Sequence, residues 1–224
     1  MITLTSEQDK KQLRKHALKQ MRSLEYEGLL LLLRELKCTD FIISKKCLEY
    51  FQSCSAREGD IDVIDHLIEK GASLYRYFHL LAHFDNLDVL QYVVEKYKLT
   101  FKDASKLDKH KGMLALCSAA SLNRMTMFKY IMNLGVETKL VLSAIAKYGE
   151  VEILDYYLSH KEEGPNYMSE ALCWSARRGH MEMVKYLVEK GVNVDYQNGL
   201  AYRSAKVMGH GDVASYIRSV SKLK

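Results

Sequence analysis

The chain has 224 residues, of which 48% are hydrophobic and 27% are charged, with one proline and 12 glycines. This composition excludes collagen-like, low-complexity and disordered chains. The net charge is only +5, and residues 1–24 alone hold six basic against two acidic side chains, so the remainder is not the broad basic surface that binds nucleic acid.

Residues 1–48 are expected to cap the fold. The stretch "SEQDKKQLRKHALKQMRSL" predicts an amphipathic helix whose apolar face consists of Leu13, Ala17, Met21 and Leu24. The five leucines at 29–33 are too few to cross a membrane, which takes about 20 apolar residues. The register of these leucines indicates a degenerate leading repeat, and the start of the chain has no apolar run typical of a signal peptide.

The cysteines and motifs argue against an enzyme or a metalloprotein. Five cysteines, at 38, 47, 54, 117 and 173, form an odd set without a C-x-x-C pair. This pattern predicts reduced thiols in a cytoplasmic compartment and no zinc site. There is no H-E-x-x-H and no glycine-rich phosphate loop, so we expect no catalytic residues, no cofactor, no metal and no small-molecule substrate.

The chain repeats one pattern along most of its length. Residues 59–74 read "GDIDVIDHLIEKGASL" and residues 179–194 read "GHMEMVKYLVEKGVNV". The pattern has a small residue three before a turn residue, then apolar pairs four and five, and eight and nine, after it. The turn residue is always Gly, Asp or Asn, which tolerate left-handed backbone: Gly59, Asp85, Asn123, Gly149, Gly179 and Gly209.

Each repeat predicts a helix, a tight turn and a second amphipathic helix. Apolar residues at these spacings form one wide stripe on a helix of period 3.6. The alanines before the turns, such as Ala56 and Ala176, would let helices approach closely, whereas Lys206 takes this place in the sixth repeat. Because one pair is too small to bury its stripe, the pairs must stack in a row.

The stretch "ALCWSARRGHMEMVKYLVEKGVNV", residues 171–194, resembles an ankyrin repeat, and the resemblance extends over residues 52–218. The repeats lack the family's T-P-L-H opening, for which "EALC" stands at 170–173, and they are shorter than the usual ~33 residues. Such short repeats of about 30 residues resemble those of large DNA viruses of protists and of some intracellular bacteria.

The resemblance implies an all-α fold, an ankyrin-type α-solenoid of about six helix-turn-helix repeats with short or absent β-hairpin fingers. The expected boundaries are an N-terminal cap helix and leading repeat in residues 1–48, the array in 49–218 and a tail in 219–224. It also implies a hydrogen bond from His180 and His210 to loop backbone, which leaves little room for Cys173 and His180 to act as nucleophile and base. Trp174 is interpreted as a filler between repeats.

The resemblance further implies a binding site for a partner protein. In ankyrin stacks the two residues before each turn lie on the concave, partner-facing side. We therefore expect the partner-binding residues to be Arg57, Glu58, His83, Phe84, Lys147, Tyr148, Arg177 and Arg178; Ser121, Leu122, Val207 and Met208 hold the same position. The basic members suggest a partner with an acidic patch, and we expect a monomer in the cytoplasm, or in a host's cytoplasm for a viral or bacterial effector.

Two alternatives stay open. The basic N-terminal helix could bind nucleic acid or another anionic surface, although the near-neutral remainder of the chain argues against it. The segment 96–113 lies in the longest step between turns, 38 residues from Asp85 to Asn123. It is either a solvated segment with a short helix over residues 103–110 or a partner-binding loop.

Overall fold

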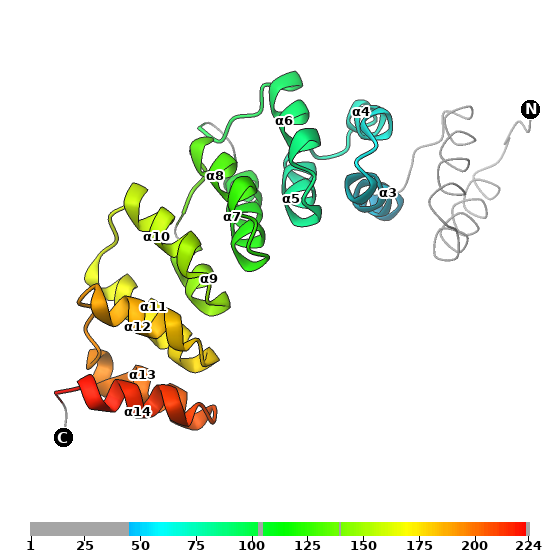
Figure 1. Ribbon diagram of the computed structural model, residues 1–224. Helices are drawn as coiled ribbons and strands as arrows, with labels where there is room; N and C mark the ends of the chain where they lie inside the picture. The colour runs from blue at the N-terminus through cyan, green and yellow to red at the C-terminus, as the bar shows by residue number, and fades with distance from the viewer. Residues whose placement is uncertain (1–44, 103–104, 139, 223–224) are drawn as a thin grey trace, which may run out of the picture. The chain divides into compact units, whose positions relative to one another are not determined.

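The computed structural model describes residues 45–102, 105–138 and 140–222, and the regular structure within these ranges is entirely helical (Figure 1). The chain divides into two compact blocks, residues 1–89 and residues 90–224. The sequence predicts a cap helix and a leading repeat in residues 1–48. Of this segment, residues 1–44 lie outside the described residues.

Twelve helices within the described residues form six consecutive pairs. They are α3 (Lys45–Glu58) and α4 (Ile61–Glu69), α5 (Leu74–Phe84) and α6 (Leu87–Lys96), α7 (Lys106–Ser121) and α8 (Met125–Asn133), α9 (Val141–Tyr148) and α10 (Val151–His160), α11 (Pro165–Arg178) and α12 (Met181–Glu189), and α13 (Tyr196–Val207) and α14 (Gly211–Val220). The border between the two blocks falls inside α6. The predicted all-α architecture of about six helix pairs is confirmed.

The turn inside each pair has the left-handed backbone that the sequence predicts. All six turn residues have positive φ: Gly59 (72°), Asp85 (69°), Asn123 (53°), Gly149 (86°), Gly179 (77°) and Gly209 (83°). A left-handed residue ends the first helix and places N–H groups of the turn where they donate to the last carbonyls of that helix, as His180 N–H donates to Ser175 O at 3.0 Å. Each pair is thus closed by a turn that a few residue types adopt at little cost.

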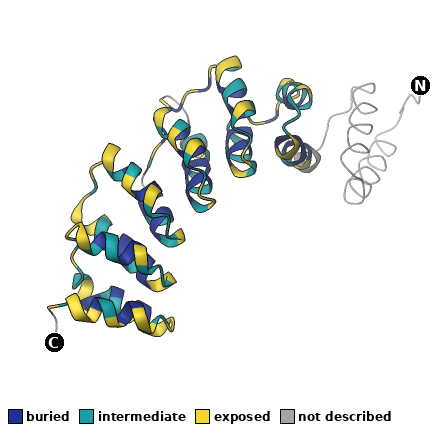
Figure 2. Ribbon diagram, in the orientation of Figure 1, coloured by how far each residue is buried: buried dark blue, intermediate teal, exposed yellow. Residues whose placement is uncertain are grey.

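The small residue before the turn is buried in the first five pairs. Ala56, Ala82, Ala120, Ala146 and Ala176 are all completely buried. In the second block α9 packs against both α7 and α11, and α11 against α13. Figure 2 shows the buried residues along the facing sides of these helices. In the sixth pair Lys206 is exposed, because none of the described residues packs on it.

In three of the pairs, the residue after the turn contacts the pair before it. His180 Nε2 lies 2.9 Å from Lys147 O, so the expected bond to loop backbone is confirmed for His180, and it bridges two pairs. The ring leaves Gly149 no room for a side chain, since a Cβ there would lie 2.7 Å from His180 Cγ. His210 packs in the same way on Gly179. In the first block the Asn86 amide donates to Arg57 O at 3.2 Å.

The connections between pairs are loops without strands in the described residues, as the short repeats predict. The segment between Asp85 and Asn123, which is the longest step between turns, differs from the predicted short helix over residues 103–110. Residues 105–110 are the N-cap and first turns of the long helix α7 and form no separate short helix. Before them Phe101, only 4% exposed, packs on Gly112, where a Cβ would lie 2.4 Å from its ring.

The C-terminal end of the described chain is held against the loop before α13. Helix α14 continues to Val220, two residues into the segment expected as a tail. Beyond it the Ser221 hydroxyl donates to Asp195 Oδ1 at 2.5 Å, and Lys222 N–H donates to Asp195 Oδ2 at 3.1 Å. This carboxylate therefore anchors residues that the sequence alone suggests are solvated.

Replacing Gly179 with alanine should destabilise the protein more than replacing Gly191 with alanine. Both have nearly the same φ, +77° and +79°, so alanine at either position incurs the same left-handed strain, about 1–2 kcal/mol. Only at Gly179 would the new Cβ meet a neighbour, His210 Nδ1 at 2.5 Å, whereas nothing lies within 4 Å at Gly191. We expect the clash to add at least about 1 kcal/mol to the loss, measured by urea denaturation.

The control is the double variant Gly179→Ala with His210→Ala, in which the imidazole ring is removed. Gly179→Ala should lower the free energy of unfolding more than Gly191→Ala does, and the double variant should recover part of this difference. Equal destabilisation by the two glycine variants would show that the contact between His210 and Gly179 does not determine the packing between these two helix pairs.

Candidate functional site

The predicted binding residues sit at the ends of the first helices, and the helical period explains why they are accessible. Each residue advances about 100° around the helix axis. The positions four and three before the turn face the core, as Ser175 and Ala176 do, so the next two turn outward. In the second block these outward positions are Ser121, Leu122, Lys147, Tyr148, Arg177, Arg178, Val207 and Met208, called here the first-helix row.

The first-helix row contains an unusual share of the exposed apolar surface. Nine large hydrophobic residues of the described chain are exposed, and four of them belong to this row: Leu122 (45%), Tyr148 (45%), Val207 (82%) and Met208 (48%). They come from three helix pairs, α7–α8, α9–α10 and α13–α14; Leu122, Tyr148 and Met208 each immediately precede the turn residue, and Val207 stands one position earlier. Scattered apolar residues need no explanation, but a run at one register position indicates a surface meant to be covered.

The middle of the row is cationic and aromatic. Arg177 and Arg178 are both exposed at the end of α11, and the Arg177 guanidinium lies 5.6 Å from the ring centre of Trp174. Lys147 Nζ lies 5.6 Å from the Tyr148 ring. The hydrogen bond from His180 to Lys147 O brings the ends of α9 and α11 together. None of the eight residues in the row is acidic.

Trp174 is partly buried and partly exposed, with Arg177 over its ring. This agrees with a residue between repeats whose rim lines the surface. An arginine over an indole face is attracted by the negative face of the ring. The exposed part of the ring adds an aromatic surface beside the row.

The other four predicted residues lie in the first block and differ in charge. Arg57 and Glu58 at the end of α3 are exposed, and Arg57 Nε lies 3.0 Å from Glu58 Oε1, so the two neutralise each other. At the end of α5, the His83 ring lies 5.1 Å from the Phe84 ring in an edge-on arrangement. His83 is exposed and Phe84 is half-buried. The first block thus presents a neutral, partly aromatic version of the same positions.

The thiol and histidine that could suggest catalysis are not arranged as a nucleophile and base. Burial raises the pKa of Cys173 to about 11, with Glu170 adding to the effect and Arg203 opposing it. A catalytic thiol needs the opposite shift. Burial likewise raises the pKa of Cys117 to about 11. Nε2 of His180 is engaged with Lys147 O.

The described residues contain no group of three or more His, Cys, Asp and Glu side chains placed to hold a metal ion. Within the same residues, no helix combines the length and the apolar character that a membrane crossing requires.

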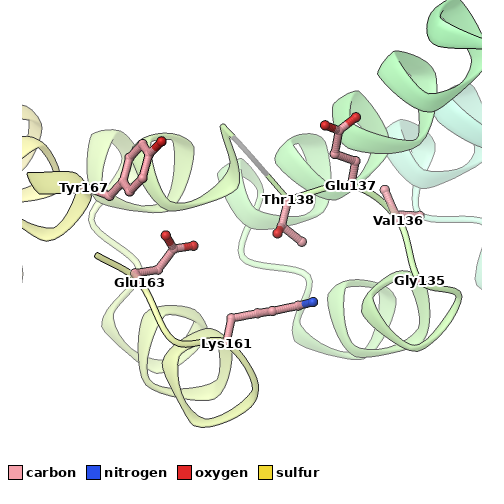
Figure 3. A pocket seen from close by; sticks show the side chains of 7 residues that line it. All are labelled: Gly135, Val136, Glu137, Thr138, Lys161, Glu163 and Tyr167. Atoms are coloured by element: carbon pink, nitrogen blue, oxygen red, sulfur yellow. The ribbon is translucent and has the colours of Figure 1, made fainter. Parts of the chain in front are cut away.

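A cleft of about 410 Å³ lies between the loop from α8 to α9 and the loop from α10 to α11 (Figure 3). It is lined by Gly135, Val136, Glu137, Thr138, Lys161, Glu163 and Tyr167. The hydroxyl of the fully buried Tyr157 donates to Glu163 Oε1 and thereby fixes one wall. The sequence analysis missed this cleft, because two separate loops with no shared motif form it. Its lining holds no pair of nucleophile and base.

Comparison with known proteins assigns the C-terminal part of the array. Residues 142–222 match the family model described as ankyrin repeats (3 copies), which spans helices α9 to α14. No curated protein matches the chain. The helix pairs, the left-handed turns and the bridging histidines of this part follow the same pattern. The segment from residue 142 to residue 222 is therefore similar to ankyrin repeats over three copies.

Proposed function

We propose that the chain is a non-enzymatic interaction module that binds a partner protein along the first-helix row. Ankyrin repeats are generally protein–protein interaction modules. The observation that carries the proposal is the concentration of exposed apolar side chains at the ends of three first helices, Leu122 on α7, Tyr148 on α9, and Val207 with Met208 on α13. Aromatic and arginine side chains in a rigid row are the anchors that protein interfaces use.

The charge of the row suggests the chemistry of the partner. Lys147, Arg177 and Arg178 stand between apolar residues on either side, with no acidic side chain in the row. A partner that places carboxylates against these three cations and apolar side chains against Val207 and Met208 would match both features. Complementary charge of this kind speeds association and rejects unsuitable partners. The partner is therefore proposed to be a protein with an acidic patch flanked by apolar residues.

The resemblance to ankyrin stacks supports placing this row on the concave side, and the reduced-thiol pattern of the sequence supports a cytoplasmic location. The alternative, binding of an anionic surface through the N-terminal helix, rests on the charge of residues 1–24, which lie outside the described residues. Deletion of residues 1–22 separates the two proposals, because it removes that charge and leaves the row intact.

Reversing the charge of Arg177 and Arg178 together, with both changed to Glu, should reduce partner capture at least tenfold. Each exposed cation that meets a carboxylate across an interface would then meet it with the wrong sign. Because both side chains are exposed, the thermal melt followed by circular dichroism should move by no more than a few degrees. Capture is measured by affinity purification from the native cell and quantitative mass spectrometry.

The matched control is Lys102→Glu with Lys106→Glu, which reverses two exposed cations in the segment 96–113 of the same block. It should leave capture unchanged. Loss of capture in this control with full capture by the arginine variant would move the site to the segment 96–113 and overturn the proposal.

The Cys173 thiol should be unreactive at neutral pH. Burial raises its pKa from the usual 9.0 to about 11. The neutral thiol is therefore favoured up to higher pH, and the reactive thiolate at pH 8 falls roughly a hundredfold. Peptide-level mass spectrometry of iodoacetamide labelling should show Cys173 reacting far more slowly in the folded protein than in urea, with a rate that rises tenfold per pH unit up to about pH 10. Fast labelling of the folded protein at pH 7 would point to an activated nucleophile and against a purely binding role.

A further inference from the structure

A tyrosine recurs at one position of the second helices, seven residues after the turn. The residues are Tyr92, Tyr130, Tyr156, Tyr186 and Tyr216, with His66 in the same place in the first pair. All of these tyrosines are half-buried. Five successive pairs thus carry a large aromatic ring with a polar tip on the flank of the apolar stripe. The helical period explains half-burial at this position, but it does not explain why the residue is tyrosine each time.

In the second block, Tyr186 and Tyr156 contact the preceding helix pair. The Tyr186 hydroxyl on α12 donates to Asp155 Oδ1 on α10 at 2.5 Å. The Tyr156 ring on α10 lies edge-on to Phe128 of α8, with ring centres 6.3 Å apart, and Lys129 Nζ of α8 lies 5.1 Å from the Tyr156 ring centre. Asp155 and Lys129 hold equivalent positions, each six residues after its turn.

The electrostatic surroundings of the other two tyrosines of this block are consistent with these contacts. The pKa of Lys185, again six residues after its turn, is raised chiefly by the hydrogen bond to Glu182 and in smaller part by Tyr216 of the next pair. The pKa of Tyr130 is raised by burial and by Glu95 of α6. The direct contacts with the preceding pair are those of Tyr186 and Tyr156.

The contact at Tyr186 includes a third member. Lys190 Nζ lies 3.7 Å from Asp155 Oδ1 and 5.1 Å from the centre of the Tyr186 ring. The carboxylate thus accepts from the phenol and attracts the ammonium group, which also covers the ring. Burial and the hydrogen bond to Asp155 both raise the pKa of the Tyr186 phenol, so it stays a donor at every physiological pH.

We propose that Tyr156 and Tyr186 form a seam along the second helices, in which Tyr156 couples α10 to α8 and Tyr186 couples α12 to α10. The stability of a repeat array is the sum of the stabilities of its repeats and of the interfaces between neighbours. The bridging histidines contribute to those interfaces beside the turns, and the tyrosines contribute on the second helices. The tyrosine seam is independent of the proposed partner-binding function, because it lies outside the first-helix row.

A double-mutant cycle on the purified full chain tests the proposal. Tyr186→Phe keeps the ring and removes the hydroxyl, and Asp155→Ala removes its acceptor across the boundary. Each single variant should raise the unfolding equilibrium constant, measured in urea, roughly fivefold. The increase in the double variant should be at least roughly threefold smaller than the product of the two single increases, because the shared contact is lost only once.

A second cycle, Tyr156→Leu with Lys129→Ala, tests the neighbouring boundary and should also be non-additive. The matched control pairs Tyr167→Phe with Asp155→Ala, since Tyr167 is an exposed tyrosine of the same block at a different position, and its effects should simply multiply. Additive effects in either seam cycle overturn the proposal, because a seam requires the contact to recur from one boundary to the next.

Discussion

A single helix pair of this chain cannot bury its own apolar stripe, and the close packing of each pair on the next is the interaction on which the structure depends. That packing explains why alanine precedes the turn at Ala146 and Ala176, which are fully buried. It also explains a second role of the turn glycines, since Gly149 and Gly179 both provide left-handed backbone and leave room for the imidazole of the next pair. A larger side chain at any of these points would separate neighbouring pairs.

The same packing divides the surface of the second block between two uses. On the first helices, the residues just before the turn point away from the seam between pairs, which leaves Tyr148, Arg177 and Val207 exposed in a row. On the second helices, Tyr186 contacts Asp155 and Tyr156 contacts Lys129 of the preceding pair. Large side chains on the second helices therefore stabilise the packing between pairs, whereas most of those in the first-helix row are exposed and free of such packing.

The proposed binding role depends on rigidity more than on any single side chain. The bond from His180 to Lys147 O and the packing of His210 on Gly179 hold the ends of α9, α11 and α13 at a fixed spacing. A row with such spacing loses little conformational entropy when a partner covers it. By contrast, the groups that would support catalysis are buried or already bonded, as Cys173 and His180 are. The cleft beside Glu163 and Tyr167 contains no residue of the first-helix row.

The local pattern of the sequence was sufficient to determine the helix pairs, the six left-handed turns and the small buried residues, because each depends on neighbours within a few positions along the chain. It also located the outward positions at the ends of the first helices. Only the tertiary structure decided that Trp174 is partly exposed under Arg177, that residues 105–110 belong to the long helix α7, and that Tyr157 fixes Glu163 at a cleft. It likewise paired Tyr186 with Asp155 and His180 with Lys147, residues about 30 positions apart. Such contacts depend on the offset between stacked pairs, which is set by how whole helices pack and which no short stretch of sequence specifies.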